Sequence, residues 1–323
     1  MKIVALDGYT LNPGDNPWDP VQRLGELVVY DRSSAEEVIT RADGADALIT
    51  NKVPFDSKRL DALPKLKLIC VSATGYNIID TAAARARNVS VCNVPEYGTN
   101  SVAQFVFALL LELAHRAGDH SRGVHDGQWV RSPDWCYWVS PQIELAGLRL
   151  GIVGFGRIGR RVGELAHALG MEVLATRSAS GKPAPEPGYD RFRWVASTEE
   201  LFAESDVVSL HCPLTAQNTG MINGVLLSRM KRSALLINTA RGGLVVEKDL
   251  AEALNAGTIA GAALDVISAE PMKADNPLRG ARNCVITPHV AWATLAARKR
   301  LMEATARNIA MFKEGRPVNV VNP

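Results

Sequence analysis

The sequence predicts an α/β protein with two domains, each built on a parallel β-sheet. Short β-branched runs alternate with segments of helical spacing through almost the whole chain, a pattern typical of parallel βαβ units. The chain has 323 residues, enough for two domains at about 150 residues each. Apolar residues make up 47% of the chain, so each domain can bury its own core.

The first series of elements occupies the N-terminal hundred residues. Strands are expected at residues 2–6, 26–30, 47–50, 66–71 and 89–92. Helices are expected at 35–42, with Ser33 or Ser34 as the N-cap, and at 81–87, with Asp80 as the N-cap. The segment 101–114 reads as a helix with a wide apolar face, which favours a place in the core or at a subunit interface.

A second series begins near residue 150. Strands are expected at residues 150–153, 172–175, 207–210, 234–238, 259–264 and 285–287. Six strands fit the two halves of a doubly wound sheet. Residues 160–169 and 293–313 have helical spacing, whereas the Pro- and Gly-rich segment 181–187 is typical of a surface loop.

Composition excludes several classes of partner. The formal net charge is +2, which argues against a nucleic-acid-binding protein. The longest apolar run, 105–111, is far shorter than the ~18 residues of a membrane span. The five cysteines are scattered without a CxxC pair, so we expect no metal site and a reducing, cytoplasmic environment.

A glycine-rich loop follows the strand at 150–153 and opens a helix. Gly154, Gly156 and Gly159 form a GxGxxG string that also contains Arg157 and Ile158. The string alone is weak evidence, but its place between a strand and a helix is the one that dinucleotide binding requires. The first glycine permits the turn, the second lets a pyrophosphate approach, and the third allows close helix–strand packing. The alternative is a purely structural turn.

The end of the next strand predicts which dinucleotide binds. An NAD site usually carries a carboxylate there for the ribose 2′-hydroxyl, about 20 residues after the loop. This strand ends instead in Thr176-Arg177-Ser178. Arg177 can pair with a 2′-phosphate and Ser178 can add a second donor, which favours NADP(H) and leaves NAD(H) as the alternative. Arg177 as a solvated surface residue is the competing interpretation.

Several stretches together resemble the D-isomer-specific 2-hydroxyacid dehydrogenases over nearly the whole chain. The stretches lie at residues 6–15, 73–77, 134–138, 154–159, 238–243 and 287–294. Within them, 8–12 and 291–294 are similar to the glycerate dehydrogenase branch of that family. The resemblance implies two Rossmann/flavodoxin-like domains with the cofactor domain inserted into the substrate domain. It divides the chain into 1–99 plus 289–323 for the substrate and 100–288 for the dinucleotide.

Three residues at strand ends have the chemistry that hydride exchange with a 2-hydroxy acid needs. Arg241 can grip a carboxylate and a carbonyl oxygen with its planar fork. His289 can carry a proton near neutral pH, and Glu270 can orient its ring and favour its protonated form. The family gives these catalytic roles to the matching residues. Taken singly, each could be a surface charge or a satisfied polar residue; together they form a catalytic set.

The resemblance implies further binding residues. Backbone N–H groups of Ala73, Thr74 and Gly75 would bind the substrate carboxylate, and Lys52 would add positive charge. The positions expected to contact the cofactor, besides the glycine loop, are Thr74, Arg177, Ser178, Cys212, Pro213, Thr239, Ala240, Arg241 and Asp265. Substrate would also contact Arg241 and His289. The aromatic run 135–138 would close a neighbouring subunit's pocket or lie in an interface.

The expected function is NAD(P)H-dependent reduction of a small 2-keto acid, hydroxypyruvate or glyoxylate, and the reverse oxidation. The resemblance also implies a homodimer. One alternative is another D-2-hydroxyacid dehydrogenase, acting on D-lactate or a 2-ketogluconate. An alternative of a different class is a nucleotide-sensing protein resembling the corepressors built on this fold.

Overall fold

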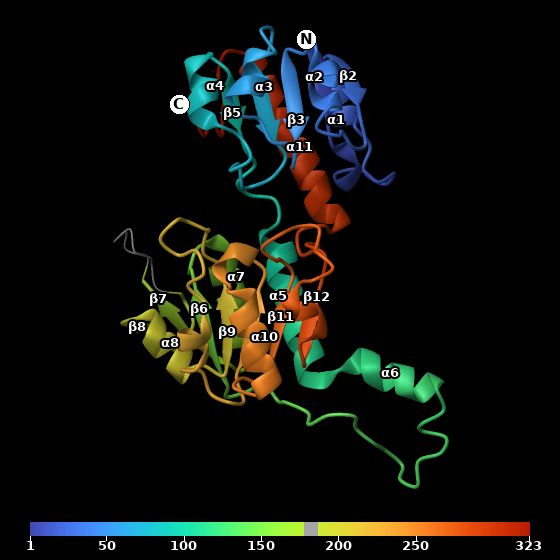
Figure 1. Cartoon of the computed structure of the whole chain (residues 1–323), viewed down its shortest axis with the longest axis vertical. Coiled ribbons are helices and arrows are strands. Elements are labelled where there is room, and N and C mark those ends of the chain that lie inside the picture. The colour runs from blue at the N-terminus through green and yellow to red at the C-terminus, as the bar shows by residue number, and fades with distance from the viewer. Residues whose placement is uncertain (178–186) are drawn as a thin grey trace. The chain divides into compact units, whose positions relative to one another are not determined.

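The computed structural model describes residues 1–177 and 187–323, which divide into two units. The first, the split unit, comprises Met1–Gly98 and Trp292–Pro323. The second, the inserted unit, is Thr99–Ala291. Each contains one parallel sheet flanked by helices (Figure 1). Two segments at opposite ends of the sequence therefore build a single unit, and the residues between them build the other.

The split unit is a five-stranded sheet of order β2-β1-β3-β4-β5. Its strands are β1 (Lys2–Ala5), β2 (Glu26–Val29), β3 (Ala47–Thr50), β4 (Leu68–Val71) and β5 (Ser90–Cys92). Its helices are α1 (Asp19–Gln22), α2 (Glu37–Ala42), α3 (Ser57–Asp61), α4 (Thr81–Ala86) and α11 (Leu295–Lys313). Because strand side chains alternate, Val4 and Leu48 face one core while Ile3 and Ile49 face the other.

The C-terminal helix α11 closes the second face of this sheet. It begins after Thr294, whose hydroxyl accepts a hydrogen bond from Ala297 N at 3.2 Å. Its Leu301 and Ile309 are fully buried against that face. Arg298, also in α11, donates to both carboxylate oxygens of Asp15 at 2.5 and 2.7 Å. The end of the chain is thus fixed to its beginning by packing and by an ion pair.

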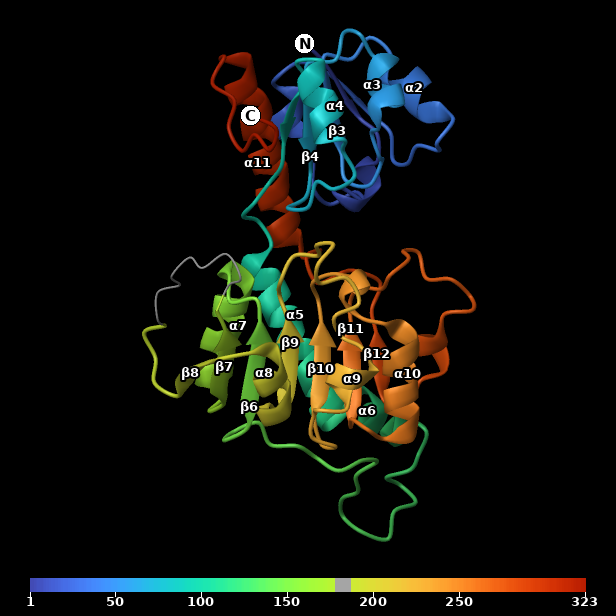
Figure 2. The ribbon, with the colours of Figure 1, turned by 60° about the vertical axis from the view of Figure 1, so that its left-hand side comes forward.

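The inserted unit is a seven-stranded sheet of order β12-β11-β10-β9-β6-β7-β8. Its strands are β6 (Arg149–Val153), β7 (Glu172–Thr176), β8 (Phe192–Val195), β9 (Val207–Leu210), β10 (Leu235–Asn238), β11 (Gly261–Leu264) and β12 (Cys284–Ile286). Its helices are α5 (Thr99–His115), α6 (Ala117–His125), α7 (Arg157–Ala168), α8 (Thr198–Glu204), α9 (Gly224–Leu227) and α10 (Glu247–Ala256). Helices α5 and α7 pack on one face and α8, α9 and α10 on the other (Figure 2).

The structure contains helices α1, α3, α6, α8, α9 and α10, which were not predicted, and it also corrects the prediction at β8 and at the start of α2. The second sheet has seven strands rather than six, because β8 was not predicted. It is a four-residue strand at the sheet edge, and its sequence Phe-Arg-Trp-Val gives little β-branched signal. Helix α2 begins at Glu37, and its N-cap residue Glu36 makes no side-chain cap. Ser33 is therefore not a cap, and its hydroxyl donates to Leu6 O instead.

Among the described residues, no helix is long and apolar enough to cross a membrane. The same part of the chain holds no cluster of potential metal ligands. All five cysteines are free.

Candidate functional site

The three glycines of the loop between β6 and α7 differ in the space around them. Gly154 has a φ of +96°, and a Cβ there would lie 2.5 Å from the Cys212 backbone nitrogen. A Cβ on Gly159 would lie 2.3 Å from Gly154 O, so helix and loop pack too closely for a side chain. A Cβ on Gly156 would meet nothing within 4 Å. Two glycines therefore serve the fold, whereas Gly156 borders open space.

The N-terminus of α7 faces this open space. Gly156 is its N-cap residue and no side chain caps it. The first N–H groups of an α-helix have no acceptor within the helix, and the helix dipole favours an anion at this end. Arg157 in the first turn is exposed, whereas Ile158 packs on the core between the sheet and α7. The loop has the properties of a pyrophosphate site.

The end of β7 carries an exposed arginine beside an aromatic ring. The Arg177 guanidinium carbon lies 4.9 Å from the ring centroid of Trp194, which belongs to the neighbouring strand β8. Ser178 lies outside the described residues. Arg177, the residue predicted to bind a 2′-phosphate, thus lies at the end of β7 as expected. Its aromatic partner Trp194 was not predicted from the sequence.

The turn after β9 holds His211, Cys212 and Pro213. Burial raises the pKa of the Cys212 thiol, so this cysteine stays protonated at neutral pH. Burial lowers the pKa of His211 to about 3, and its Nε2 lies 2.8 Å from the Ser209 hydroxyl. His211 is therefore neutral near pH 7 and does not serve as an acid there.

The loop after β10 presents Thr239, Ala240 and Arg241. The buried Thr239 hydroxyl has no hydrogen-bond partner among the described residues. Asn238 shapes the loop, because its Oδ1 accepts from Ala240 N at 3.0 Å and its Nδ2 donates to Arg241 O at 2.9 Å. Sequence reasoning did not identify Asn238, although an asparagine at a strand end is a usual turn-former.

The loop that carries Arg241, after β10, packs closely against the loop after β11. A Cβ on Gly242 would lie 1.8 Å from the carbonyl carbon of Ile267, so only glycine allows the loops after β10 and β11 to touch. The Arg241 Nη1 donates to Ala240 O at 2.6 Å. This bond uses one of the five N–H donors of the guanidinium, so most of the fork remains for a substrate.

His289 and Glu270 form a hydrogen-bonded pair. The His289 Nδ1 lies 2.7 Å from the Glu270 Oε2, and the two side chains are 29% and 30% exposed. Each therefore reaches solvent while packed against protein. His289 adopts a φ of +55°, an uncommon conformation for a residue with a side chain. With Nδ1 bonded to the carboxylate, Nε2 is the nitrogen left to exchange a proton.

Asp265 is buried beneath His289. Its carboxylate accepts hydrogen bonds from the Thr287 hydroxyl at 2.6 Å, from Val290 N at 2.9 Å and from Ala291 N at 2.8 Å. These donors flank His289 on both sides. The side chain expected to contact the cofactor thus binds the backbone that carries His289.

The predicted site residues of the inserted unit lie at one edge of its sheet. The loops that bear them follow β6, β7, β9, β10, β11 and β12, whose carboxyl ends share that edge. In doubly wound sheets, ligands bind at this edge. The open space at Gly156, the uncapped helix and the unpartnered Thr239 hydroxyl fit a dinucleotide.

The predicted substrate residues of the split unit follow β3 and β4. Asp7 organises the first of these loops, because its carboxylate accepts from Asn51 N at 2.9 Å and from Lys52 N at 2.6 Å. Burial raises the pKa of Asp7 despite these bonds. Lys52, Arg32 and Arg59 line a hollow of about 330 Å³ beside it. Asp7 and Asp31 line the same hollow, so its lining carries charges of both signs.

The second loop is Ala73, Thr74 and Gly75. The Thr74 hydroxyl donates to Val94 O at 3.1 Å, and Asn93 Nδ2 donates to Thr74 O at 2.7 Å. These bonds and that from Val94 N to Ala73 O use the carbonyl side of the loop. Within the described residues, the N–H groups of Ala73, Thr74 and Gly75 donate to no protein acceptor. They have the character of an anion-binding nest.

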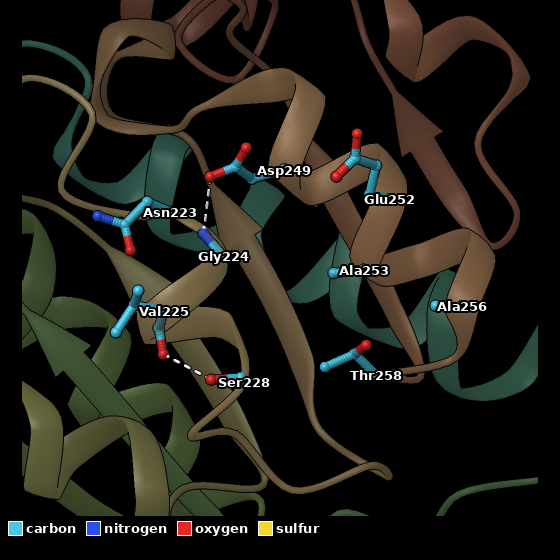
Figure 3. A pocket seen from close by; sticks show the side chains of 9 residues that line it. All are labelled: Asn223, Gly224, Val225, Ser228, Asp249, Glu252, Ala253, Ala256 and Thr258. Carbon is cyan, nitrogen blue, oxygen red and sulfur yellow. Dashed lines mark hydrogen bonds between the residues drawn. The ribbon is translucent and has the colours of Figure 1, made fainter.

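A larger hollow of about 470 Å³ lies between α9 and α10 of the inserted unit (Figure 3). Asp249 points toward the start of α9, where its carboxylate accepts from Gly224 N at 2.8 Å. None of the predicted site residues lines this hollow. Although this hollow is larger than the one beside Asp7, we do not take it as the functional site.

Fold and site together define an α/β oxidoreductase that binds a nicotinamide dinucleotide. Residues 107–291 match the profile of the D-isomer specific 2-hydroxyacid dehydrogenase NAD binding domain. The chain is 49% identical over its full length to the full length of a hydroxypyruvate reductase from Blautia hydrogenotrophica. It is 41% identical to a glycerate dehydrogenase from Methylorubrum extorquens, covering 99% of this chain and 98% of that protein. The chain belongs to the D-isomer specific 2-hydroxyacid dehydrogenase family.

A solved structure supports the same relationship. An NADPH-dependent glyoxylate/hydroxypyruvate reductase from Sinorhizobium meliloti, in complex with NADP and malonate, superposes with a TM-score of 0.82. It is 27% identical, and the match covers 99% of this chain and 96% of that one. The fold class, the family and the oxidoreductase class expected from the sequence are therefore confirmed.

Proposed function

We propose that the protein reduces hydroxypyruvate, glyoxylate or both with NADPH, giving D-glycerate or glycolate, and catalyses the reverse oxidation. The observation that carries the proposal is the His289–Glu270 pair, at 2.7 Å, on the sheet edge that also bears Arg241 and the glycine loop. The similarity to a hydroxypyruvate reductase and a glycerate dehydrogenase supports the choice of substrate.

We assign the inserted unit to the cofactor and the split unit to the substrate. The expected ranges, 100–288 for the cofactor and 1–99 plus 289–323 for the substrate, have slightly different boundaries from these units. The pyrophosphate would lie at Gly156 and the N-terminus of α7, with the positions of Arg157 and Ile158 beside it. Loop residues Cys212, Pro213, Thr239 and Ala240 would line the rest of the cofactor site. Asp265 belongs to the same edge, although its carboxylate oxygens are already bonded to protein donors.

The substrate carboxylate would be bound by cations and by backbone donors. In the split unit, we assign this role to Lys52 and to the N–H groups of Ala73, Thr74 and Gly75, and the family resemblance adds a cofactor contact for Thr74. In the inserted unit, Arg241 has unused N–H donors for the carboxylate and the keto oxygen. A planar guanidinium suits this task because it binds two oxygens at once.

The chemistry requires one hydride and one proton. When bound, the reduced nicotinamide supplies the hydride that C2 of the keto acid accepts. Protonated His289 donates the proton from Nε2 to the keto oxygen, so the carbonyl becomes a hydroxyl and the imidazole becomes neutral. Glu270 stabilises the imidazolium before transfer, and Arg241 stabilises the negative charge that develops on the oxygen. In the oxidation, neutral His289 accepts the hydroxyl proton.

The preference for NADPH over NADH is part of the proposal. Arg177 is exposed at the end of β7, and the residues from Glu172 to Arg177 place no carboxylate at that strand end for a ribose 2′-hydroxyl. A guanidinium at this point favours a 2′-phosphate. Ser178, as the second donor, stays a prediction.

The test is an assay of nicotinamide absorbance with a panel of keto acids and both cofactors. We expect the highest kcat/KM for hydroxypyruvate or glyoxylate with NADPH. A higher value for pyruvate or 2-ketogluconate would assign the protein to another branch of the family. NADPH binding without turnover of any keto acid would favour the nucleotide-sensing alternative. His289→Gln should lower kcat by about 10²–10⁴ and retain NADPH binding.

A homodimer and a cytoplasmic location also stay proposals. Helix α6 and the chain after it extend away from the sheet of their own unit (Figure 1). This arm exposes Trp135 by 86% and Trp138 by 69%, and exposed aromatic side chains are typical of interaction surfaces. Measurement of the molar mass in solution tests the dimer, which Trp135→Asp combined with Trp138→Asp should weaken.

A further inference from the structure

The aromatic ring beside Arg177 follows from the register of two strands. Trp194 of β8 pairs with Ala175 of β7. Residues two apart in a strand lie on the same face, so Arg177 follows Ala175 on the side where Trp194 stands. The Arg177 guanidinium carbon lies 4.9 Å from the ring centroid, within the range of a cation–π contact.

The ring of Trp194 is itself held in place by other aromatic rings. The Phe155 centroid lies 5.5 Å away and the Phe192 centroid 5.0 Å away, both in edge-to-face contact. The indole Nε1 is buried without a hydrogen-bond partner among the described residues. Packing rather than polar bonding therefore sets the orientation of the indole, and its π-face is what it offers to Arg177.

The contact with the indole leaves N–H donors of the Arg177 guanidinium for a ligand. The guanidinium carries five N–H donors, and a cation–π contact depends on its charge rather than on hydrogen bonds. A phosphate binds to two of these donors. An unsupported arginine would lose rotamer freedom on binding the phosphate, whereas one that already contacts the indole has lost part of it.

Phe155 extends the argument to the rest of the cofactor site. It lies between Gly154 and Gly156 in the proposed pyrophosphate loop, and the Arg160 guanidinium carbon lies 4.9 Å from its ring centroid. Phe155, Phe192 and Trp194 thus form one aromatic cluster that contacts the loop at one end and Arg177 at the other.

We propose that Trp194 is a positioning residue that holds Arg177 for the 2′-phosphate and so strengthens the preference for NADPH. The inference rests on the proposed role of Arg177 in that preference. Trp194 itself touches neither the substrate nor the nicotinamide in this proposal, because it acts through the guanidinium.

Two probes isolate the effect: 2′,5′-ADP and 5′-AMP differ only in the 2′-phosphate. Their dissociation constants are measured by calorimetry on the full-length protein and on Trp194→Met, which keeps an apolar side chain in the cluster. We expect 2′,5′-ADP to bind about two- to fivefold more weakly, the range of an exposed cation–π contact, and 5′-AMP to bind equally. Equal weakening of both probes, or no weakening of either, would overturn the proposal.

Controls separate this inference from the proposed function. Arg177→Met should weaken 2′,5′-ADP at least as much, and adding Trp194→Met to it should cause no further loss. If Arg177→Met has no effect, the role of Arg177 in NADPH preference is wrong. If Arg177→Met weakens binding and Trp194→Met does not, only the role of Trp194 is wrong.

Phe192→Met is the matched variant, because Phe192 packs on Trp194 on the same strand but is not the ring that contacts Arg177. A selective loss as large as that of Trp194→Met would show that general packing, not the indole face, is responsible. Should Trp194→Met fail to fold, Trp194→Phe retains a ring in the cluster with a weaker cation–π contact. It should then lose 2′,5′-ADP affinity selectively, and unchanged affinity would overturn the proposal.

Discussion

The Glu270 carboxylate determines which nitrogen of His289 is left to face a substrate, because it is hydrogen-bonded to Nδ1. Glu270→Gln keeps a hydrogen-bond acceptor within reach of Nδ1 but removes the charge that lies 2.7 Å away. We expect kcat for keto-acid reduction to fall about tenfold near pH 7, because a charge-assisted hydrogen bond is roughly twice as strong as a neutral one.

Steady-state kinetics of the wild-type and Glu270→Gln proteins check this expectation. His289→Gln provides the reference, with a loss in kcat of about 10²–10⁴. Equal kcat values for wild type and Glu270→Gln would mean that the charge on the carboxylate does not assist His289.

Asp265 acts on the same histidine through the backbone. Asp265→Asn replaces an acceptor of three hydrogen bonds by an amide whose NH₂ group must face at least one N–H or O–H donor. We expect the inserted unit to lose about 1–3 kcal/mol of unfolding free energy. The value of kcat should fall while the KM for NADPH stays nearly constant, because the segment that carries His289 loses its support.

Steady-state kinetics and urea unfolding of Asp265→Asn measure both effects, and Thr287→Val removes only one of the three donors. A raised KM for NADPH with unchanged kcat would instead indicate the direct cofactor contact that the family resemblance implies.

At the scale of elements, the glycines of the β6–α7 loop have two different roles. Gly154 and Gly159 are required by backbone packing, whereas Gly156 leaves space for the ligand. Gly156→Ala has space for its Cβ, so we expect an unchanged melting temperature and a large loss of NADPH affinity, because the methyl group occupies the phosphate's approach. Gly159→Ala places its Cβ 2.3 Å from Gly154 O and should lower the melting temperature as well. Calorimetry and NADPH titration on both variants decide the matter; full affinity in Gly156→Ala would remove this loop from the pyrophosphate site.

The sequence predicted the elements whose signal is local. Buried parallel strands such as Ala47–Thr50 and Val207–Leu210 were located to the residue, because both faces are covered and every residue except Ser209 is β-branched or apolar. The edge strand β8 was missed because it is half-exposed and aromatic. The side chains of Trp194 and Asn238 were missed as well. The contact of Trp194 depends on how β8 pairs with β7, and that of Asn238 depends on a turn. Neither kind of contact produces a periodic pattern in the sequence. The division into two units likewise depends on long-range packing of α11.

At the scale of the whole molecule, two ionisable groups make the protein sensitive to acid in different pH ranges. Burial lowers the pKa of His211 from 6.5 to about 3. Between these two pH values the unfolded chain therefore binds a proton on His211 that the folded chain does not bind. Stability is therefore lost as the pH falls below 6.5. The hydrogen bonds from Arg298 lower the pKa of Asp15 from its ordinary value of 3.8, so that pair weakens only at still lower pH. Between pH 6.5 and pH 4, His211 should dominate over the Asp15 pair.

His211→Gln tests this separation, because glutamine can still hydrogen-bond to Ser209 but cannot titrate. We expect the free energy of unfolding to fall less steeply between pH 6.5 and pH 4, by at most about 1.4 kcal/mol per pH unit. Urea unfolding at a series of pH values measures the slope, and the exposed His125, changed to Gln, provides a control that should leave it unaltered. If His211→Gln and wild type lose stability in parallel, His211 is protonated in the folded protein. The turn after β9 would then carry a positive charge beside the proposed cofactor site rather than a neutral ring.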